Sequence, residues 1–313
     1  MNVATFYRFV RIEDPHALAT SLRARCTELD LAGTIVLAHE GINATLAGLP
    51  DALERFVAAL RADRRFADVA VRYSRGAGDE PVFYRLKVGV RRELIAMHRA
   101  DVDPAARTGE HVGAAEWNRL LDDPDVTVID ARNAYEIELG SFPGAVDPAT
   151  RSFREFPAFA DTLDPTTHPR VAMFCTGGIR CEKASAYLLA RGFESVYQLD
   201  GGILNYIDTV GADNRFVGEC FVFDQRVALD DSLDRGAYRV CHACRHALSE
   251  GDVQSPSFVV DVSCPHCIGR QTEQQRASFA ERARQAKLAA ARGERHVGAT
   301  MPAATSPTTR PRR

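Results

Sequence analysis

Short runs of alternating apolar and polar residues alternate with helical patterns along the first ninety residues. A period of two predicts strands at residues 3–10, 34–38, 43–47 and 69–73. Asp14-Pro15 begins a predicted helix that ends near Leu29, and Leu49-Pro50-Asp51 begins another that ends near Leu60. The predicted order is therefore strand, helix, strand, strand, helix, strand.

This order resembles a ferredoxin-like split βαβ unit, so residues 1–97 are expected to form a ferredoxin/acylphosphatase-like α+β domain. A further strand is predicted over residues 82–90. Its apolar side chains share one face: Val82, Tyr84, Leu86, Val88 and Val90. The basic side chains Arg85, Lys87 and Arg91 share the other. A basic strand face suits the phosphate backbone of a nucleic acid, and it equally suits the solvated side of a half-buried sheet.

The middle of the chain carries a different pattern. Residues 98–113 are predicted to be a linker, because Asp103-Pro104 and Thr108-Gly109 are typical of turns. Beyond it, buried strands at residues 126–130, 171–174 and 195–199 alternate with helical segments. This alternation predicts a parallel α/β sheet over residues 113–212. Ligands of such sheets bind at the carboxyl ends of the strands, which is where Cys175 falls.

Length, charge and the start of the chain narrow the class of protein. At 313 residues the chain is long enough for two or three domains. The first residues lack the long apolar run of a secretory signal, and no run is long enough to cross a membrane, so we expect a cytoplasmic protein. The net charge of −3 is unevenly distributed: residues 270–313 carry a net charge of +7 and residues 1–269 carry −10. A basic tail on an acidic body suits a polyanionic partner, and it also suits a solvated helix with a frayed end.

One cysteine stands where a reactive thiolate is expected. Cys175 follows a buried strand and precedes a loop whose backbone, from Thr176 through Gly177 and Gly178 to Ile179, opens a helix. Glycines let successive N–H groups turn toward the sulfur as an anion cradle, and the helix N-terminus and Arg180 add positive charge. All of these favour the thiolate. The alternative is a buried cysteine that acts as a small apolar residue.

The pattern Cys-x4-Arg after a buried strand resembles the active-site loop of rhodanese sulfurtransferases. Three further segments resemble rhodanese motifs, and they are Asp130-Ala131-Arg132 with Glu136, Gly140-Ser141-Phe142-Pro143-Gly144-Ala145, and Leu199-Asp200-Gly201-Gly202-Ile203 with Tyr206. Related phosphatases have Cys-x5-Arg, but that arginine position holds Cys181 here. The six-residue loop suits a sulfur atom carried on the cysteine, so a phosphatase is disfavoured.

The resemblance narrows when more of the chain is included. The string Cys-Thr-Gly-Gly-Ile-Arg-Cys-Glu-Lys-Ala from Cys175, the segment His39-Glu-Gly-Ile-Asn-Ala-Thr-Leu-Ala-Gly48 and two C-terminal C-x-x-C pairs together resemble the rhodanese-related tRNA uridine hydroxylases. The resemblance implies an oxidoreductase that forms 5-hydroxyuridine at the tRNA wobble position, with tRNA as partner, molecular oxygen as co-substrate and Cys175 as the essential cysteine. The residues alone indicate sulfur transfer, so a thiosulfate or persulfide sulfurtransferase is the enzymatic alternative. The non-enzymatic alternative is an RNA- or protein-binding adaptor with a relic rhodanese fold. The intact Cys175 and Arg180 argue against that alternative.

Cys181 and the turn at His39 and Glu40 each have two interpretations. Cys181 lies close enough in sequence to Cys175 to resolve an oxidised form of it, and the alternative, which we favour, is that it only packs. His39 and Glu40 occupy a turn between strands, where they either contact RNA or form a polar hairpin tip.

The C-terminal residues predict a metal site. Cys241 and Cys244 form one C-x-x-C pair, and Cys264 and Cys267 form another, with nineteen residues between the two pairs. This spacing is typical of a tetrahedral structural zinc site in residues 213–295, where a small segment needs metal to fold. The alternatives are four reduced thiols or two disulfides, and His242, His246 or His266 could replace one cysteine. A charged helix is predicted from Thr272 to about Arg292, and residues 296–313 are predicted to be disordered.

Overall fold

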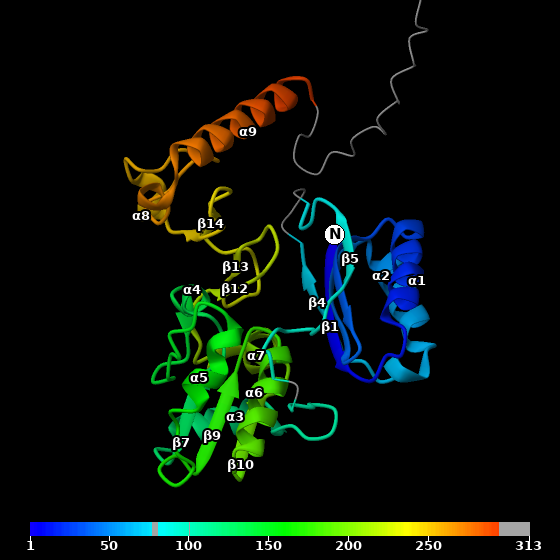
Figure 1. Ribbon diagram of the computed structural model, residues 1–313, viewed down its shortest axis with the longest axis vertical. Helices are drawn as coiled ribbons and strands as arrows, with labels where there is room; N and C mark the ends of the chain where they lie inside the picture. Colours follow the sequence, from blue (N-terminus) through cyan, green and yellow to red (C-terminus); the bar gives the residue numbers. More distant parts are fainter. Residues whose placement is uncertain (77–80, 100, 294–313) are drawn as a thin grey trace, which may run out of the picture. The chain divides into compact units, whose positions relative to one another are not determined.

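The computed structural model describes residues 1–76, 81–99 and 101–293. The chain divides into two compact units (Figure 1). The first comprises Met1–Val240 with His246–Gly251, and the second comprises Cys241–Arg245 with the chain from Asp252 onward. The predicted disordered tail, residues 296–313, lies outside the described residues.

The N-terminal part of the first unit has the predicted βαββαβ order. Its elements are β1 (Asn2–Phe9), α1 (Pro15–Glu28), β2 (Ala32–Ala38), β3 (Gly41–Gly48), α2 (Pro50–Arg61), a 3-10 turn (Arg64–Phe66) and β4 (Val71–Arg75). Asp14 caps α1, since its carboxylate accepts a hydrogen bond from Ala17 N at 2.9 Å. The strands form an antiparallel sheet in the order β4-β1-β3-β2. The expected ferredoxin-like architecture is confirmed.

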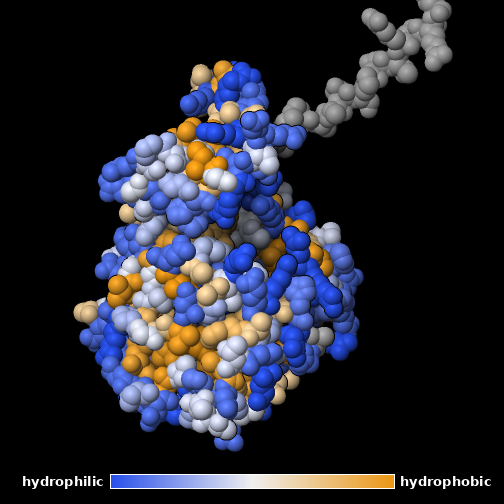
Figure 2. Space-filling model, turned by 60° about the vertical axis from the view of Figure 1, so that its left-hand side comes forward, coloured by the Kyte–Doolittle hydropathy of each residue, from blue (hydrophilic) through white to orange (hydrophobic). Residues whose placement is uncertain are grey.

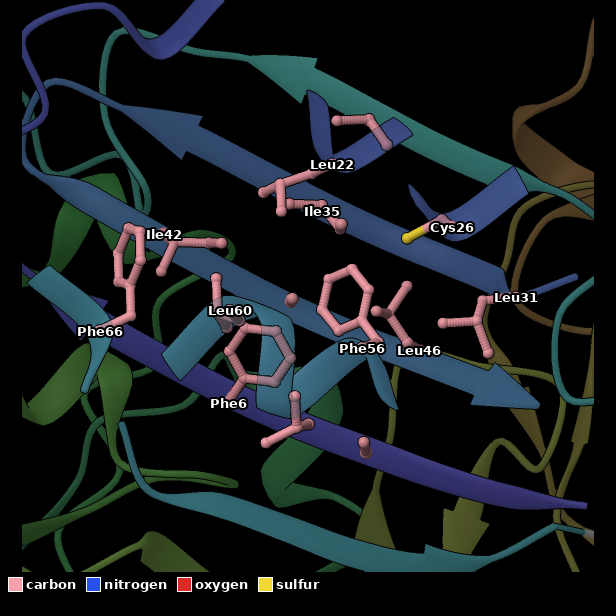
Figure 3. Packing of buried hydrophobic residues seen from close by; sticks show 14 of the residues in the cluster. Phe6, Leu22, Cys26, Leu31, Ile35, Ile42, Leu46, Phe56, Leu60 and Phe66 are labelled. Carbon is pink, nitrogen blue, oxygen red and sulfur yellow. The ribbon is translucent and has the colours of Figure 1, made fainter. Parts of the chain in front are cut away.

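One face of this sheet is apolar and the other is polar. Strand residues such as Phe6, Ile35 and Leu46 pack against Leu22 of α1 and Phe56 of α2 (Figure 3). Both helices therefore cover the same face (Figure 1). Because side chains alternate along a strand, Thr5, Tyr7 and Thr45 lie on the opposite face, where Thr5 Oγ1 bonds Thr45 Oγ1 at 3.4 Å. This polar face contributes to the site described below.

The strand predicted over residues 82–90 is shorter than expected. β5 (Leu86–Val90) pairs in parallel with β2, and its first ladder pair is Gly33 with Leu86. β2 begins at Ala32, so residues 82–85 have almost no partner strand to extend along. Val82 instead packs in a separate small cluster, and Tyr84, expected on the apolar face of the strand, is 40% exposed.

The next part of the first unit is a parallel α/β domain. Its elements are β6 (Glu110–Val112), α3 (Ala114–Asp122), β7 (Val126–Asp130), α4 (Ala134–Ile137), β8 (Gly140–Ser141), a 3-10 turn (Phe153–Glu155), α5 (Phe156–Ala160), β9 (Arg170–Phe174), α6 (Ile179–Ala190), β10 (Ser195–Leu199), α7 (Gly202–Val210) and a 3-10 turn (Gly211–Asp213). The sheet order is β6-β10-β9-β7, and every pair is parallel. α5 and α6 contribute to the core on one face, and α3 and α7 contribute to the core on the other. The predicted parallel fold is confirmed, but β6 lies within the predicted linker because three residues are too few to show a strand period.

Short elements complete the described chain. β11 (Val217–Gly218) pairs with β8, β12 (Cys220–Phe221) with β13 (Ala228–Leu229), and β14 (Arg239–Val240) with β15 (Ala247–Leu248). They are followed by α8 (Glu250–Gln254), a 3-10 turn (Ile268–Arg270) and α9 (Glu273–Ala291). Thr272 and Gln275 form a reciprocal capping box at the start of α9, which confirms the predicted helix.

The face of the molecule drawn in Figure 2 is largely polar. Figure 2 shows hydrophilic residues over most of the visible face, with apolar residues gathered in a patch on its lower part. Among the described residues, no helix combines the length and the apolar character that crossing a membrane requires.

Candidate functional site

Cys175 lies at the carboxyl end of the central strand β9, where the sequence predicts a ligand site. The start of α7 holds the loop that follows, since Ile203 N donates to Cys175 O at 2.9 Å and Leu204 N donates to Thr176 O at 3.2 Å. Gly202 makes this approach possible, because a Cβ on it would lie 2.3 Å from Cys175 O. The Gly-Gly motif therefore serves the active-site loop through close backbone packing.

Backbone N–H groups surround the sulfur of Cys175, which is fully buried. Gly178 N donates to Sγ at 3.1 Å, and the backbone N–H groups of Arg180 and Cys181 also lie against it. Gly178 has φ +97°, a left-handed conformation that favours glycine and turns its N–H inward at the start of α6. Of the four predicted cradle residues, Gly178 is the one whose N–H bonds the sulfur. The backbone roles of Thr176, Gly177 and Ile179 stay predictions.

The surroundings of Cys175 stabilise its thiolate. Burial raises the pKa of this thiol, but a hydrogen bond from the Cys181 thiol, the charge of Arg180 and the backbone N–H groups outweigh burial and lower the pKa to about 5. At the buried thiols of Cys26 and Cys220, burial dominates: at Cys220 it outweighs the nearby charges of Arg132 and Arg180, and it raises the pKa of each thiol to about 12. Cys175 is therefore ionised at neutral pH, and these two cysteines are not.

Arg180 is held by a buried carboxylate. Its guanidinium donates Nη1 to Glu136 Oε2 at 2.6 Å and Nη2 to Glu136 Oε1 at 2.8 Å, a bidentate pair. Nη2 also lies 3.2 Å from Thr176 Oγ1. The predicted positive charge of Arg180 is thus present beside the loop. It is paired with the carboxylate of Glu136, and the guanidinium also contacts Thr176 of the loop.

A second buried ion pair supports this arrangement. Arg132 donates Nη2 to Asp130 Oδ2 at 2.6 Å and to Gly140 O at 2.6 Å. Ser141 Oγ donates to the same Asp130 oxygen at 2.8 Å. The segments that resemble the first two rhodanese motifs therefore meet in one hydrogen-bonded network beneath the loop.

Sequence reasoning did not assign Glu182 and its partners. Glu182 Oε1 accepts from Tyr7 Oη at 2.9 Å and lies 3.0 Å from His111 Nε2, and Oε2 accepts from Thr108 Oγ1 at 2.8 Å and from Gln198 Nε2 at 3.2 Å. Tyr7 belongs to β1, 175 residues away in sequence. The one signal available was a carboxylate in the first turn of a helix that begins at the reactive loop.

Lys183, the next residue of α6, contacts the turn that contains His39 and Glu40. Lys183 is buried, and its Nζ lies 2.9 Å from Glu40 Oε1 and 2.9 Å from Glu93 Oε2. Glu40 Oε1 also accepts from Leu94 N at 2.6 Å, while His39 Nδ1 lies 2.9 Å from Ile12 O. The ion pairs of Lys183 with Glu40 and Glu93 link the two domains of the first unit, and the His39 contact lies within the N-terminal domain.

The four C-terminal cysteines form one cluster in the second unit. Their sulfur atoms all lie within 4.8 Å of one another, with Cys264 Sγ 3.7 Å from Cys244 Sγ and 3.6 Å from Cys267 Sγ. Tetrahedral Zn–S bonds of about 2.3 Å place sulfurs roughly 3.8 Å apart, so the donor set and spacing fit zinc. None of the eight cysteines forms a disulfide in this structure, which excludes the alternative of two disulfides here.

The histidines named as replacement ligands have other partners. His242 Nε2 lies 3.9 Å from Asp261 Oδ1, His246 Nε2 lies 3.6 Å from Glu138 Oε2, and His266 Nε2 lies 3.0 Å from Asp252 Oδ1. Within the described part of the chain, the side chains placed closely enough to hold a metal ion are the four cysteines, with no histidine among them.

The predicted basic strand face is exposed. Arg85 precedes β5, Lys87 lies on it and Arg91 follows it, and all three side chains face solvent. β5 is an edge strand of the N-terminal sheet. Their contact with RNA stays a prediction.

Comparisons with known proteins cover both domains. Residues 1–94 match the family model described as UPF0176 acylphosphatase like domain. Residues 113–209 match the model of the rhodanese-like domain. These matches agree with the two folds described above.

Three curated relatives match nearly the whole chain, and each is named tRNA uridine(34) hydroxylase. The protein from Teredinibacter turnerae is 45% identical over 309 residues, covering 98% of this chain and 96% of the relative. The relative from Mesorhizobium japonicum is 47% identical over 301 residues, with 95% and 97% covered. The one from Acaryochloris marina is 47% identical over 296 residues, with 94% and 95% covered. At this identity and coverage, the chain belongs to the tRNA uridine(34) hydroxylase family.

Proposed function

We propose that this protein hydroxylates the wobble uridine of tRNA to 5-hydroxyuridine, as an oxidoreductase of the monooxygenase type. The observation that carries the proposal is the near-full-length identity to three proteins named tRNA uridine(34) hydroxylase. The intact loop from Cys175 to Arg180, with its stabilised thiolate, supports an active enzyme over a relic fold.

The reaction replaces the hydrogen on C5 of uracil with a hydroxyl group whose oxygen comes from molecular oxygen. The second oxygen atom leaves as water, which requires two electrons and two protons. We assign them to a thiol reductant, two thiols of which become one disulfide. Uracil, one oxygen molecule and two thiols then balance against 5-hydroxyuracil, water and a disulfide.

Cys175 is the reactive group in this proposal. Its sulfur lies inside a ring of backbone N–H donors that suits an anionic sulfur, either the thiolate or a persulfide formed by taking up one sulfur atom. Thr176, Gly177, Gly178 and Ile179 form the cradle. Arg180, fixed by Glu136, keeps the loop closed around the anion.

The second unit contributes a structural metal site. We propose that Cys241, Cys244, Cys264 and Cys267 bind one zinc ion, because four thiolates at tetrahedral spacing leave no open position for catalysis. Zinc would supply folding energy to a segment with little apolar core of its own.

The partner implied by this function is tRNA. We propose that the exposed basic residues Arg85, Lys87 and Arg91 contact its phosphates, away from the thiolate. A wobble base is unpaired, so it can leave its stack at little cost to reach the buried sulfur.

The experiment that tests the proposed function is nucleoside analysis of tRNA from a strain in which this gene is deleted. We expect 5-hydroxyuridine to disappear from bulk tRNA and to return when the wild-type gene is restored. Unchanged 5-hydroxyuridine in the deletion strain would refute the proposal.

A sulfurtransferase is the second candidate, because the six-residue loop with a buried thiolate is the geometry that a persulfide needs. A thiosulfate:cyanide assay on the purified protein tests it. Turnover comparable to a rhodanese, together with unchanged 5-hydroxyuridine in the deletion strain, would favour sulfur transfer.

A further inference from the structure

A cavity of about 810 Å³ lies within the first unit, against the thiolate loop. Its wall includes Tyr7 of β1, Arg72 of β4, His111 of β6 and Gly177 of the loop itself. The volume falls in the range of roughly 300–1,000 Å³ that is typical of sites for small ligands. Of the residues assigned to the thiolate loop, Gly177 lines this cavity and Cys175 does not, and none of the four zinc-site cysteines lines it.

The polar face of the N-terminal sheet forms one wall. The antiparallel register pairs Thr5 with Arg72, so the Arg72 side chain lies on the same face as Tyr7. Tyr7 Oη would lie 2.8 Å from a Cβ on Gly178, and Arg72 Nη2 would lie 1.7 Å from a Cβ on Gly201. Both side chains therefore lie directly against the loops that hold Cys175.

Arg72 has hydrogen-bonding capacity that the protein does not use. Its Nη2 lies 3.5 Å from Asp200 Oδ2, in a partly exposed pair. Its Nε is buried and has no acceptor among the residues that the structure describes. A guanidinium with an unused donor and a loose ion pair is suited to donate a hydrogen bond to an anionic oxygen of a ligand.

His111 is held in a fixed orientation on the other wall. Its Nε2 lies 3.0 Å from Glu182 Oε1, and the hydrogen bonds from Tyr7, Thr108 and Gln198 fix that carboxylate. The other ring nitrogen, Nδ1, has no partner in the described part of the chain. The hydrogen bond with Glu182 raises the pKa of His111, which favours the form in which Nδ1 donates.

We propose that this cavity binds one unstacked nucleotide of the tRNA, with Arg72 donating to a phosphate oxygen and His111 donating to a carbonyl of the base. The Tyr7 ring offers an aromatic surface beside the base. The inference rests on the proposed function, since it assumes that RNA is the substrate. It adds that the N-terminal sheet forms part of the substrate site.

The test is binding of a fluorescently labelled RNA hairpin whose anticodon loop carries uridine at the wobble position. Full-length wild type is compared with Arg72→Gln and with His111→Gln by anisotropy. Each substitution removes one charge-assisted hydrogen bond, so we expect the Kd to rise roughly tenfold. Circular dichroism and thermal unfolding confirm that each variant is folded.

Arg119→Gln is the matched control, because Arg119 is exposed on α3, pairs with Glu116 and is not part of the cavity wall. It should bind the hairpin like wild type. If Arg72→Gln and His111→Gln also bind like wild type, the inference is wrong and the cavity only separates the two domains. Should one variant fail to fold, the other decides the question.

A second hairpin with cytidine at the wobble position locates the nucleotide. If the cavity holds the target base, wild type prefers the uridine hairpin and His111→Gln loses that preference. If it holds a neighbouring nucleotide, both hairpins weaken equally in the variants. Binding is measured without turnover, so a loss here is distinguishable from an absence of 5-hydroxyuridine in wild-type cells, which would contradict the proposed function itself.

Discussion

A fully enclosed thiol ordinarily stays protonated, because burial penalises the charged form. Cys220 shows this behaviour, and burial raises its pKa to about 12. Cys175 is just as buried, but a thiol, an arginine and several backbone N–H groups converge on it and its pKa falls to about 5. The difference between the two residues is the set of hydrogen-bond donors, and the left-handed Gly178 at the start of α6 turns its backbone N–H toward the sulfur of Cys175.

Replacing Cys175 with serine should abolish 5-hydroxyuridine formation, because a hydroxyl in the same place stays protonated at neutral pH. We expect the free energy of unfolding to change by less than about 2 kcal/mol, since serine keeps the size and the hydrogen bonds of the site. Nucleoside analysis after complementation and urea denaturation measure the two effects. Wild-type levels of the modified nucleoside with the serine variant would contradict the assigned role.

Cys181 should tune the Cys175 thiolate through the hydrogen bond that its thiol donates. Cys181→Ala removes the donor, so the pKa of Cys175 should rise from about 5 toward the ordinary value of 9.0. Cys181→Ser keeps a donor and should stay near wild type. A pH titration of thiolate ultraviolet absorbance, with Cys175→Ser as the blank, reports the midpoint. Equal midpoints in the alanine and serine variants would show that Cys181 only packs.

At the scale of the element, the first turn of α6 holds four consecutive buried residues that make polar contacts around the site. Each of them contacts a different part of the fold. Arg180 pairs with Glu136, the Cys181 thiol helps to lower the pKa of Cys175, Glu182 accepts from Tyr7, and Lys183 pairs with Glu40 and Glu93. A helix buried on every side of one turn must satisfy each polar group, so this turn fixes the loop and both domains together.

Glu136→Gln tests how much the buried ion pair contributes. The substitution leaves the charge of Arg180 buried without its partner, and we expect unfolding to become easier by about 3–5 kcal/mol. Glu116→Gln is the control, since its pair with Arg119 is exposed and should change stability by less than about 1 kcal/mol. Urea denaturation of both variants measures the difference. A similar small change in both would show that Arg180 finds another partner.

Local patterns predicted most elements, because strands and helices leave periodic signals and caps such as Asp14-Pro15 mark their starts. Local patterns did not predict β6, which has only three residues. They also placed the start of β5 too early, because residues 82–85 have almost no partner strand. The cysteine loop was predictable since its residues are consecutive. The Tyr7–Glu182 contact was not, because it joins positions 175 residues apart and neither residue carries a local signal for the other.

At the scale of the molecule, we expect the fold of the second unit to depend on zinc bound by its four cysteines. Elemental analysis of protein purified without chelators should find one zinc per chain, and Cys264→Ser should lower zinc content and expose the second unit to proteolysis. The rhodanese domain should unfold as in wild type, because none of these cysteines belongs to the first unit. Four titratable thiols and no metal would refute the zinc proposal.

Holding a whole tRNA requires contacts beyond the thiolate loop, and exposed positive charge is available in two places. One is the face of β5 with Arg85, Lys87 and Arg91, and the other is the C-terminal basic segment, described here from Arg270 to Arg292. Each phosphate contact releases counterions, so binding should weaken steeply as salt concentration rises.

The double substitution Arg85→Ala with Lys87→Ala separates these two surfaces. Removing two phosphate contacts should raise the KM for tRNA and flatten the dependence of binding on salt, with a slope smaller by about 2. The turnover rate at saturation should hold, because neither residue belongs to the site around Cys175. Filter binding of tRNA over a salt series measures the slope, and Arg276→Ala with Arg284→Ala on α9 is the matched pair. If the α9 pair loses affinity while the β5 pair binds like wild type, the strand face is only a solvated sheet surface, and the tRNA is held by the second unit instead.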